Sequence, residues 1–470
     1  MWTDKNPETQ LLFDVFKKEG HEVAYWIGLN GGEYMAPKGT IFHDHYDAWN
    51  ALPAPALVNL RFSPPDARIL SSMYKTESII LSMMNKRYDS KSVDERKQIY
   101  YDMLGYWNHV FDKIEPEAVI FFTIPHSIYS NIIYEIARMR GIKTLCSDPT
   151  WVANRLIWYE DFWNGSDELR SAITRNQNKS VSPHDLGSEL QKYWEEHTGE
   201  KYGKEPAYMT VQRNIGEGVG LIKHRLRVAL RAMREGNFFQ LVFDFLLRFG
   251  KDNLKREHER VEKKADWDIP FVYFPLHFQP ECTSTPQGGA YHQQILVAET
   301  LSAALPRGWQ LFIKEHPAQW WMRGKTRFSS ARYRGYYERL ASIPRVRLVP
   351  ISTDTFQLTK RSQAVAVIAG TSGWEALLYG KYPLVFGIPW YRDCPGVLRV
   401  DSVESCVSAF KKVMNGAHVP QNSLLAFLKS VEEISIRAYI ENPPGGDPTY
   451  SAQENMRIIA SHLSKLLLAD

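Results

Sequence analysis

The C-terminal half of the sequence alternates short β-rich runs with helical stretches, and this alternation constrains the fold more than any other feature. Residues 271–274 predict a strand, 293–305 a helix and 309–313 a second strand, and the pattern continues to residue 415. Strands separated by helices are typical of right-handed βαβ units, in which helices cover both faces of a parallel sheet. We therefore expect a Rossmann-like domain in this half.

The N-terminal half shows the same alternation more weakly. A helix predicted at 7–19 precedes a strand-like run at 22–27, and an apolar run at 118–123 precedes a helix at 127–140 that ends at Gly141. Glycine often follows a helix C-terminus because it adopts left-handed backbone angles without strain. We expect a second α/β domain here. Because doubly wound domains usually begin with a strand, either a first strand is missing or this domain is wound differently.

The fold class that we predict is α/β, with two Rossmann-like domains joined by a helical, basic segment. A chain of 470 residues is long enough for roughly two to four domains. A stripe of apolar residues along the last predicted helix indicates burial, either against the N-terminal domain or against its own. The expected segments are 1–164, the N-terminal domain; 165–265, the basic segment; 266–425, the C-terminal domain; and 426–470, the terminal helices.

The charges are nearly balanced overall but unevenly distributed. The chain has 57 basic and 53 acidic side chains, a balance that disfavours a dedicated nucleic-acid binder. Residues 223–264 hold 12 Lys or Arg and 6 Asp or Glu, and the helical pattern within them places a basic face opposite an apolar one. Two alternatives fit this segment: linker helices with a solvated charged face, or a peripheral contact with an anionic membrane.

The cysteines and the apolar runs indicate the compartment. Four cysteines without a C-x-x-C spacing predict neither disulfides nor a thiolate zinc site, and they favour a reducing environment. The sequence shows no basic-then-apolar leader and no run of about 18 apolar residues. We expect a cytoplasmic protein, which contacts the inner membrane peripherally if the second alternative for the basic segment holds.

The most informative motif is the turn Gly370-Thr371-Ser372-Gly373, which follows a buried-type strand and opens a helix. Small residues let the backbone approach a ligand closely, and the free N–H groups at a helix start attract anions such as phosphate. Glu375 lies in the first helical turn, where its carboxylate would accept hydrogen bonds from ribose hydroxyls. The turn lacks the G-x-x-x-x-G-K-[ST] pattern of a P-loop. The alternative is a plain strand–helix turn capped by Thr371 or Ser372.

Polar residues follow two other predicted strands of the same domain. His277 and Gln279 come after the first strand, and Lys314 and His316 come after the second. Ligands of open parallel sheets bind at the carboxyl ends of the strands, so we expect these side chains to meet the Gly370 turn at one edge. Lysine, protonated imidazole and glutamine amide groups donate the hydrogen bonds that a diphosphate needs without a metal ion. A single histidine at a strand end is more often structural, but three such elements at one edge favour a binding site.

Three motifs together resemble the bacterial capsular polysaccharide biosynthesis family, which includes Kdo transferases. They are PLHFQPE at 275–281, KEHP at 314–317 and GTSGWEALLYGKYPLVFG at 370–387, and the resemblance covers about residues 270–400. It implies a GT-B fold, in which two Rossmann-like domains face each other across a cleft, and a CMP-activated acidic sugar as donor. The donor pocket that it implies contains His277, Gln279, Lys314, His316, Thr371, Ser372 and Glu375, to which the turn itself adds Gly370 and Gly373.

Glycosyl transfer also needs a base or nucleophile opposite the leaving phosphate. His126 and Asp148 follow apolar strands of the N-terminal half and are our candidates for this role, and His277 completes the set of predicted catalytic residues. The alternatives are that His126 packs or begins its helix and that Asp148 caps a turn with Pro149. Retaining members of the resembled family use a carboxylate, which keeps Asp148 a candidate.

Two further clusters invite a metal interpretation that we do not favour. In His43-Asp44-His45 the two imidazoles share a strand face that Asp44 does not, and no completing ligand is evident. Asp266-Trp267-Asp268 resembles the D-x-D of metal-dependent glycosyltransferases, but it precedes its strand instead of following it. We expect no metal and no cofactor apart from the nucleotide-sugar donor.

These observations predict a glycosyltransferase of bacterial capsule or lipopolysaccharide assembly that uses a CMP-linked, Kdo-like acid. Its expected partners are the nucleotide-sugar donor and a glycan or lipid-linked acceptor, together with an anionic membrane if the basic segment contacts lipid; no nucleic acid is expected. Two alternatives stay open. One is a phosphotransferase that uses a CDP-linked polyol, and the other is a non-catalytic GT-B-like scaffold protein.

Overall fold

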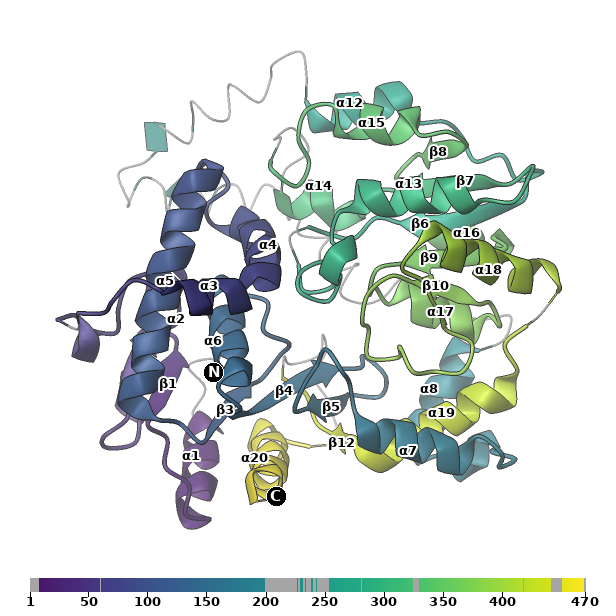
Figure 1. The fold of residues 1–470 in the computed structure, drawn as a ribbon. Helices are drawn as coiled ribbons and strands as arrows, with labels where there is room; N and C mark the ends of the chain where they lie inside the picture. The colour runs from purple at the N-terminus through teal and green to yellow at the C-terminus, as the bar shows by residue number, and fades with distance from the viewer. Residues whose placement is uncertain are drawn as a thin grey trace. The chain divides into compact units, whose positions relative to one another are not determined.

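The computed structural model of the chain contains two compact units (Figure 1). One unit comprises residues 1–195 and 422–470, and the other comprises residues 196–421. The residues that the structure describes are 8–59, 61–198, 253–279, 281–323, 329–416, 418–440 and 450–468, with single positions at 226, 229, 230, 233, 238, 239 and 242.

The C-terminal unit is built on one parallel sheet. The strands lie in the order β11-β10-β9-β6-β7-β8, and every neighbouring pair is parallel. The chain starts in the middle of the sheet, proceeds to one edge at β8, and returns to build the other edge from β9. This is the doubly wound order of the Rossmann fold, as predicted. The strands are β6 (Phe271–Pro275), β7 (Gln310–Lys314), β8 (Val346–Val349), β9 (Ala364–Val367), β10 (Pro383–Val385) and β11 (Leu398–Arg399).

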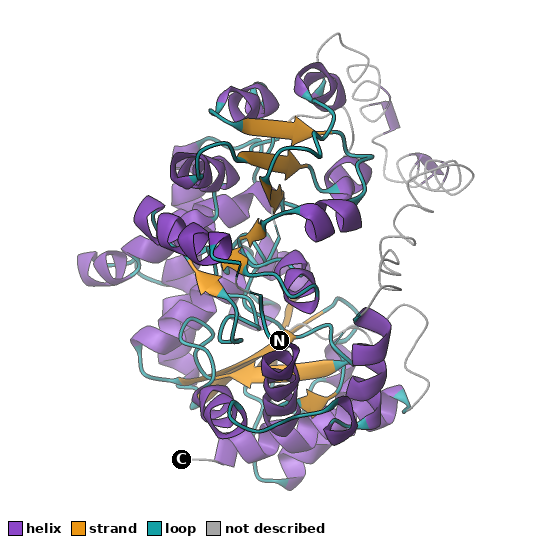
Figure 2. Ribbon diagram, turned by 90° about the vertical axis from the view of Figure 1, so that its right-hand side faces the viewer, coloured by secondary structure: helices purple, strands orange, loops and turns teal. Residues whose placement is uncertain are grey.

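Helices cover both faces of this sheet, as Figure 2 shows. All four residues of β9 are 0% exposed, because a strand covered on both faces has no solvated side. This burial explains why the sequence shows continuous apolar runs here rather than an alternating pattern. The helices of the unit are α12 (Leu254–Val261), α13 (Gln294–Ala304), α14 (Pro317–Arg323), α15 (Tyr336–Ser342), α16 (Thr355–Arg361), α17 (Ser372–Leu378) and α18 (Val403–Met414).

The N-terminal unit divides its strands between two sheets. β1 (Tyr25–Gly28) and β2 (Ile41–Asp44) form a parallel pair. A second sheet has the order β12-β5-β4-β3, in which only β3 and β4 run parallel. The α/β class is therefore confirmed, while the winding of this unit differs from that of the C-terminal one. The second sheet contains β3 (Ala118–Phe121), β4 (Lys143–Pro149), β5 (Arg155–Tyr159) and β12 (Ile436–Arg437).

A tight hairpin between β4 and β5 sets this mixed topology. Trp151, Ala153 and Asn154 adopt left-handed backbone angles, with φ of 57°, 49° and 52°. The buried hydroxyl of Thr150 accepts a hydrogen bond from the Val152 N–H and donates to the Arg155 carbonyl at 3.0 Å. A connection this short joins only antiparallel strands, since a parallel crossover needs about a dozen residues or more.

Helices from both ends of the chain share the core of the N-terminal unit. α20 (Ala452–Leu468) packs against α1 (Glu8–Lys18). Leu12 of α1 and Leu463 of α20 are both 0% exposed and belong to one cluster. The other helices of the unit are α2 (His45–Trp49), α3 (Ala67–Ser72), α4 (Tyr74–Met83), α5 (Val93–Ile114), α6 (Ile128–Met139), α7 (Asp167–Asn176), α8 (Ser188–His197) and α19 (Gln421–Ile434).

The basic face predicted near residue 230 lies outside the described residues, because Arg225, Arg227, Arg231 and Arg234 are not among them. Among the residues that are described, no helix is both long and apolar enough to cross a bilayer.

Candidate functional site

The carboxyl ends of β7, β6 and β9 lie side by side at one edge of the C-terminal sheet. Pro275 at the end of β6 pairs with Lys314 at the end of β7, and β6 also pairs with β9. The connections after β6 and β9 leave toward opposite edges of the sheet, which makes this pair the topological switch point where doubly wound sheets bind ligands. The sequence motifs after these three strands therefore converge on one edge.

His277 bridges the two central strands at the switch point. The backbone N–H of Ile368 donates to Nε2 of His277 at 2.9 Å, and that of Ala369 does so at 3.4 Å. Because Nε2 accepts, the proton of the neutral ring is on Nδ1. Burial, with the nearby charges of His316 and Arg332, lowers the pKa of His277 to about 3. The ring is neutral at pH 7 and offers one N–H.

His316 is fixed in the opposite tautomer. Its Nδ1 accepts from the Ala318 N–H at 3.1 Å at the start of α14, which places the ring proton on Nε2. Burial is the main cause that lowers its pKa to about 4. The expectation of protonated imidazoles at this edge is therefore wrong for both histidines, because burial and backbone donors hold the rings neutral.

Lys314 and Gln279 are engaged within the protein. The Lys314 ammonium donates to the Thr353 carbonyl and the Thr355 hydroxyl, both at 2.6 Å, and the residue is 6% exposed. Gln279 donates from Nε2 to the His292 carbonyl at 3.0 Å and accepts at Oε1 from Arg332. Both side chains thus join neighbouring loops of the edge, and their assignment to donor binding stays a prediction.

The two glycines of the turn after β9 accommodate protein side chains. A Cβ atom at Gly370 would lie 2.7 Å from Cε1 of His277. A Cβ at Gly373 would meet the hydroxyl of Tyr391, which itself donates to the Gly370 carbonyl at 2.5 Å. Thr371 precedes the seven-residue α17 and makes no side-chain capping bond, so it is not a capping residue. Thr371 is exposed and Ser372 partly exposed.

Glu375 in α17 has the most perturbed carboxyl of this edge. Burial raises its pKa from 4.5 to about 7. Its carboxylate has no hydrogen-bond partner among the residues that the structure describes, although the side chain keeps partial contact with solvent. A desolvated, unsatisfied carboxyl beside the switch point is suited to accept hydrogen bonds from a ligand.

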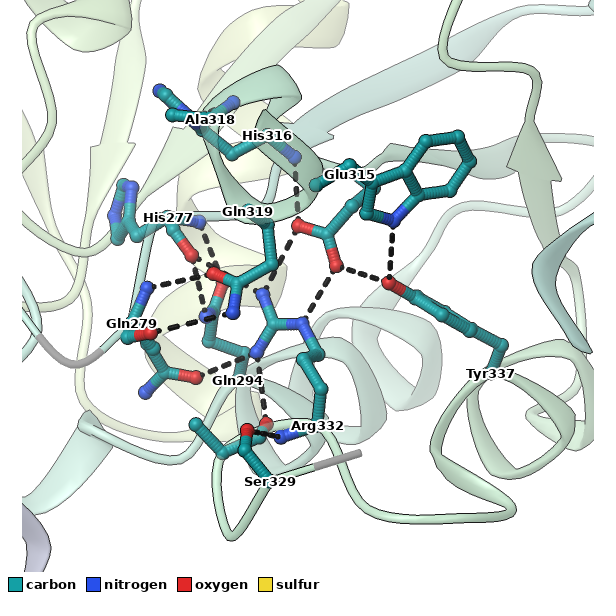
Figure 3. A network of polar contacts seen from close by, with 12 residues as sticks. His277, Gln279, Gln294, Glu315, His316, Ala318, Gln319, Ser329, Arg332 and Tyr337 are labelled. Carbon is teal, nitrogen blue, oxygen red and sulfur yellow. Dashed lines mark hydrogen bonds and ion pairs between the residues drawn. The ribbon is translucent and has the colours of Figure 1, made fainter. Parts of the chain in front are cut away.

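A buried polar network, which the sequence did not predict, lies behind the carboxyl edge of the C-terminal sheet (Figure 3). Glu315 and Arg332 form an ion pair at 2.6 Å, and both are fully buried. Tyr337 donates to the same Glu315 carboxylate at 2.7 Å. Glu315 could have been noticed as an acidic residue directly after an apolar strand, but Arg332 lies in a stretch without periodicity or motif.

The N-terminal unit brings His126 and Asp148 to neighbouring strand ends. The pairing of Phe121 with Cys146 places the residues after β3 and the end of β4 at the same edge. His126 is not the N-cap of α6, because Ser127 occupies that position, and its Nδ1 lies 2.8 Å from the Ile124 carbonyl. Asp148 is inside β4, paired with Ile157, and is 8% exposed.

Trp151 adds an exposed aromatic surface to the same end of β4. It is 61% exposed and lies three residues after Asp148 on the β4–β5 hairpin. The sequence does not predict this exposure, because a turn with left-handed backbone angles is usually recognised by a glycine, and residues 150–154 contain none.

The His43-Asp44-His45 cluster is committed to internal contacts. His43 lies with Nδ1 at 2.7 Å from the Tyr25 hydroxyl and Nε2 at 2.9 Å from the Leu52 carbonyl, so both ring nitrogens have partners. Asp44 caps α2. Asp266, of the D-x-D sequence, accepts from the Asp268 N–H. Within the described part of the chain, no group of three or more His, Cys, Asp or Glu residues is arranged to hold a metal ion.

Comparison with known families identifies the C-terminal sheet region. Residues 286–418 match the family model described as "Capsule polysaccharide biosynthesis protein". The match contains the KEHP motif and the Gly370 turn, so it confirms the family resemblance in this part of the chain. No protein of curated function matches the sequence.

Solved structures of carbohydrate-active enzymes show distant similarity. The Thermosulfurimonas dismutans KpsC β-Kdo 2,7 transferase is 9% identical, with 69% of this chain and 88% of that chain covered at a TM-score of 0.30. The β-Kdo 2,4 transferase of Thermosulfurimonas dismutans KpsC is 13% identical, with 66% of this chain and 78% of that chain covered at a TM-score of 0.28. The UDP-GlcNAc 2-epimerase of Neisseria meningitidis is 11% identical, with 99% of this chain and 98% of that chain covered at a TM-score of 0.26.

Substituting Gly370 tests the contact with His277. Gly370→Ala should destabilise the C-terminal unit by about 1–3 kcal/mol, because the new methyl group displaces the imidazole from its backbone donors. Urea unfolding measures this change. In a His277→Ala background the same substitution should cost less than about 1 kcal/mol, since the obstruction is gone. Equal costs in both backgrounds would contradict the contact.

Replacing Glu375 tests its raised pKa. The folded state holds the proton more tightly than the unfolded state, so this stabilising contribution is lost as the pH rises from 4.5 toward about 7. Glu375→Gln should therefore raise the unfolding free energy at pH 8 by about 2 kcal/mol, allowing for partial exposure, and change it little at pH 5. Urea unfolding at both pH values measures the difference. Glu404→Gln, in the exposed first turn of α18, is the control; a pH-independent effect of Glu375→Gln would refute the assignment.

Proposed function

We propose that this protein is a GT-B-type glycosyltransferase of bacterial surface-polysaccharide assembly, and that its nucleotide-sugar donor binds at the carboxyl edge of the C-terminal sheet. The observation that carries the proposal is the convergence of the segments after β6, β7 and β9 at the switch point, two of them within the residues that match the capsule family. Open parallel sheets bind their ligands at this position.

The donor that we propose is a CMP-linked, Kdo-like acid, with no metal ion or other cofactor. The N–H groups of His277 and His316 and the backbone of the Gly370 turn would donate to the donor phosphate, and ribose hydroxyls would donate to Glu375. In the reaction the bond between the anomeric carbon and a phosphate oxygen breaks, and CMP leaves with the electron pair. An acceptor hydroxyl oxygen forms the new bond to that carbon and gives up its proton.

The acceptor side of the reaction is assigned to the N-terminal unit. His126 or Asp148 would act there as the base that takes the acceptor proton, or Asp148 as the nucleophile of a retaining reaction. Trp151 supports this assignment, because an exposed indole stacks well on the apolar face of a sugar ring. The acceptor is a glycan or a lipid-linked saccharide.

Nucleotide binding is the direct test. CMP should raise the melting temperature of the protein more than UDP or GDP does, because binding to the folded state alone stabilises it. His316→Ala should remove most of this shift, while His184→Ala, at an exposed site, should preserve it. Stabilisation by UDP alone would refute the CMP assignment. No shift with any nucleotide would instead favour the scaffold alternative.

The product distinguishes the proposed glycosyltransferase from the alternative, a phosphotransferase that uses a CDP-linked polyol. A phosphotransferase attacks phosphorus and leaves a phosphate in the linkage, whereas a glycosyltransferase attacks the anomeric carbon. Phosphorus analysis of the product from a synthetic acceptor distinguishes the two.

We also propose that the cytoplasmic enzyme associates peripherally with the anionic inner membrane through residues 223–264. Leu226, Leu230 and Met233 are 64%, 52% and 53% exposed, which favours an apolar stripe available to lipid over one packed on the protein. The surplus of basic residues in this stretch suits anionic headgroups.

Vesicle sedimentation tests this contact. Replacing Arg225, Arg227, Arg231 and Arg234 with Gln should weaken binding to phosphatidylglycerol-containing vesicles at least tenfold, because each basic residue near such a surface contributes about 1 kcal/mol. The control replaces four exposed lysines elsewhere, Lys17, Lys18, Lys411 and Lys412. Equal loss in both variants, or no loss in the first, would return the segment to the linker interpretation.

A further inference from the structure

The Glu315–Arg332 pair lies behind the switch point, away from solvent. Both side chains are 0% exposed, and the carboxylate accepts from Arg332 at both oxygens, at 2.6 and 3.1 Å. It also accepts from the Tyr337 hydroxyl and the His316 N–H, each at 2.7 Å. Burial opposes the ionisation of Glu315, but the Arg332 charge and these hydrogen bonds outweigh it and hold its pKa below the ordinary value.

The guanidinium of Arg332 uses all five of its N–H groups. Two donate to the Glu315 carboxylate. The others donate to the Gln279 side-chain oxygen at 2.8 Å, the Ala331 carbonyl at 3.0 Å and the His277 carbonyl at 3.2 Å. Figure 3 shows the guanidinium at the centre of these contacts. Since no donor is left over and the side chain is fully buried, Arg332 does not itself bind a ligand.

Two glutamine side chains clamp the segment that comes after β6. Gln294 accepts from the His277 N–H at 2.7 Å and donates to the His277 carbonyl at 3.0 Å. Gln319 does the same for Gln279, at 3.0 and 3.3 Å. Each amide bonds one backbone N–H and one carbonyl as a neighbouring strand would, so the backbone of His277 and Gln279 is held beyond the end of the sheet.

One ion pair therefore fixes the backbone at both histidines of the edge. Glu315 holds the His316 N–H, and Arg332 holds the His277 carbonyl. The remaining ring proton is on Nδ1 of His277 and on Nε2 of His316, because the other nitrogen of each ring accepts from the backbone. The Arg332 fork, whose planar geometry allows little variation, thus links the two backbone segments that carry these donors.

We propose that Arg332 and Glu315 are positioning residues for the donor site, which set the spacing of the His277 and His316 N–H donors for the anionic group of the ligand. The inference rests on the proposed function for the identity of the ligand. A buried ion pair is by itself weak evidence for a stabilising role, because apolar residues of similar volume often replace one without loss. The geometry that the pair imposes is the property that apolar residues lack.

The decisive variant replaces both charges. Glu315→Leu/Arg332→Met removes the fork without leaving a buried charge unpaired, and Arg332→Lys retains the charge without the fork. Both variants should show cooperative unfolding and bind CMP at least tenfold more weakly than the wild type in calorimetric titration of the full chain. Arg339→Met, which removes an exposed ion pair with Glu299, should bind CMP as the wild type does.

Imidazole tautomers provide a readout that needs no ligand. In the ¹⁵N-histidine-labelled wild type, His277 should be the Nδ1–H form and His316 the Nε2–H form, and in Arg332→Lys the His277 signal should shift toward an average of the two forms. Unchanged tautomers and CMP affinity within twofold of the wild type in Arg332→Lys would overturn the proposal, even if the double variant fails to fold. If the wild type binds no nucleotide, the proposed function fails, while the tautomer comparison still decides the positioning role.

Discussion

The hydrogen bond from the Ile368 N–H to His277 joins the two central strands of the C-terminal unit at their carboxyl ends. At a switch point the loops that follow the two strands turn toward opposite edges of the sheet. Neither loop therefore covers the backbone N–H groups between the strand ends, such as that of Ile368. A side chain must supply the acceptor. His277 does so. The absence of a side chain at Gly370 leaves room for its ring, and burial keeps the ring neutral so that Nε2 can accept.

Much of the C-terminal fold was predictable because a strand covered on both faces leaves an apolar run that any reader of the sequence sees. The motif residues could likewise be assigned to one edge, since strand order brings together the segments after β6, β7 and β9. The use that the protein makes of these residues could not be predicted. The protonation of His277 and His316 depends on backbone donors that are distant in the sequence or set by a local turn, and Arg332 reaches His277 from 55 positions away.

The N-terminal unit shows a different limit. Its strands alternate with helices as expected, but the Thr150 hairpin reverses β5, and no glycine announces the left-handed residues that make this turn. The polar cluster at His43 shows the same limit. Its sequence resembles a set of metal ligands, but the His43 ring nitrogens bond to Tyr25 and Leu52 within the protein. In both cases the local sequence allows several outcomes and tertiary contacts decide among them.

The packing of α20 on α1 has a consequence for the order of events during synthesis. The C-terminal unit is one continuous stretch, whereas the N-terminal unit is assembled from both ends of the described chain. A ribosome therefore releases a complete C-terminal unit before the N-terminal unit can close its core around Leu12 and Leu463. Until residues 452–468 emerge, the part of α1 that packs against α20 lacks this cover, and its exposed apolar side chains favour aggregation of the nascent chain.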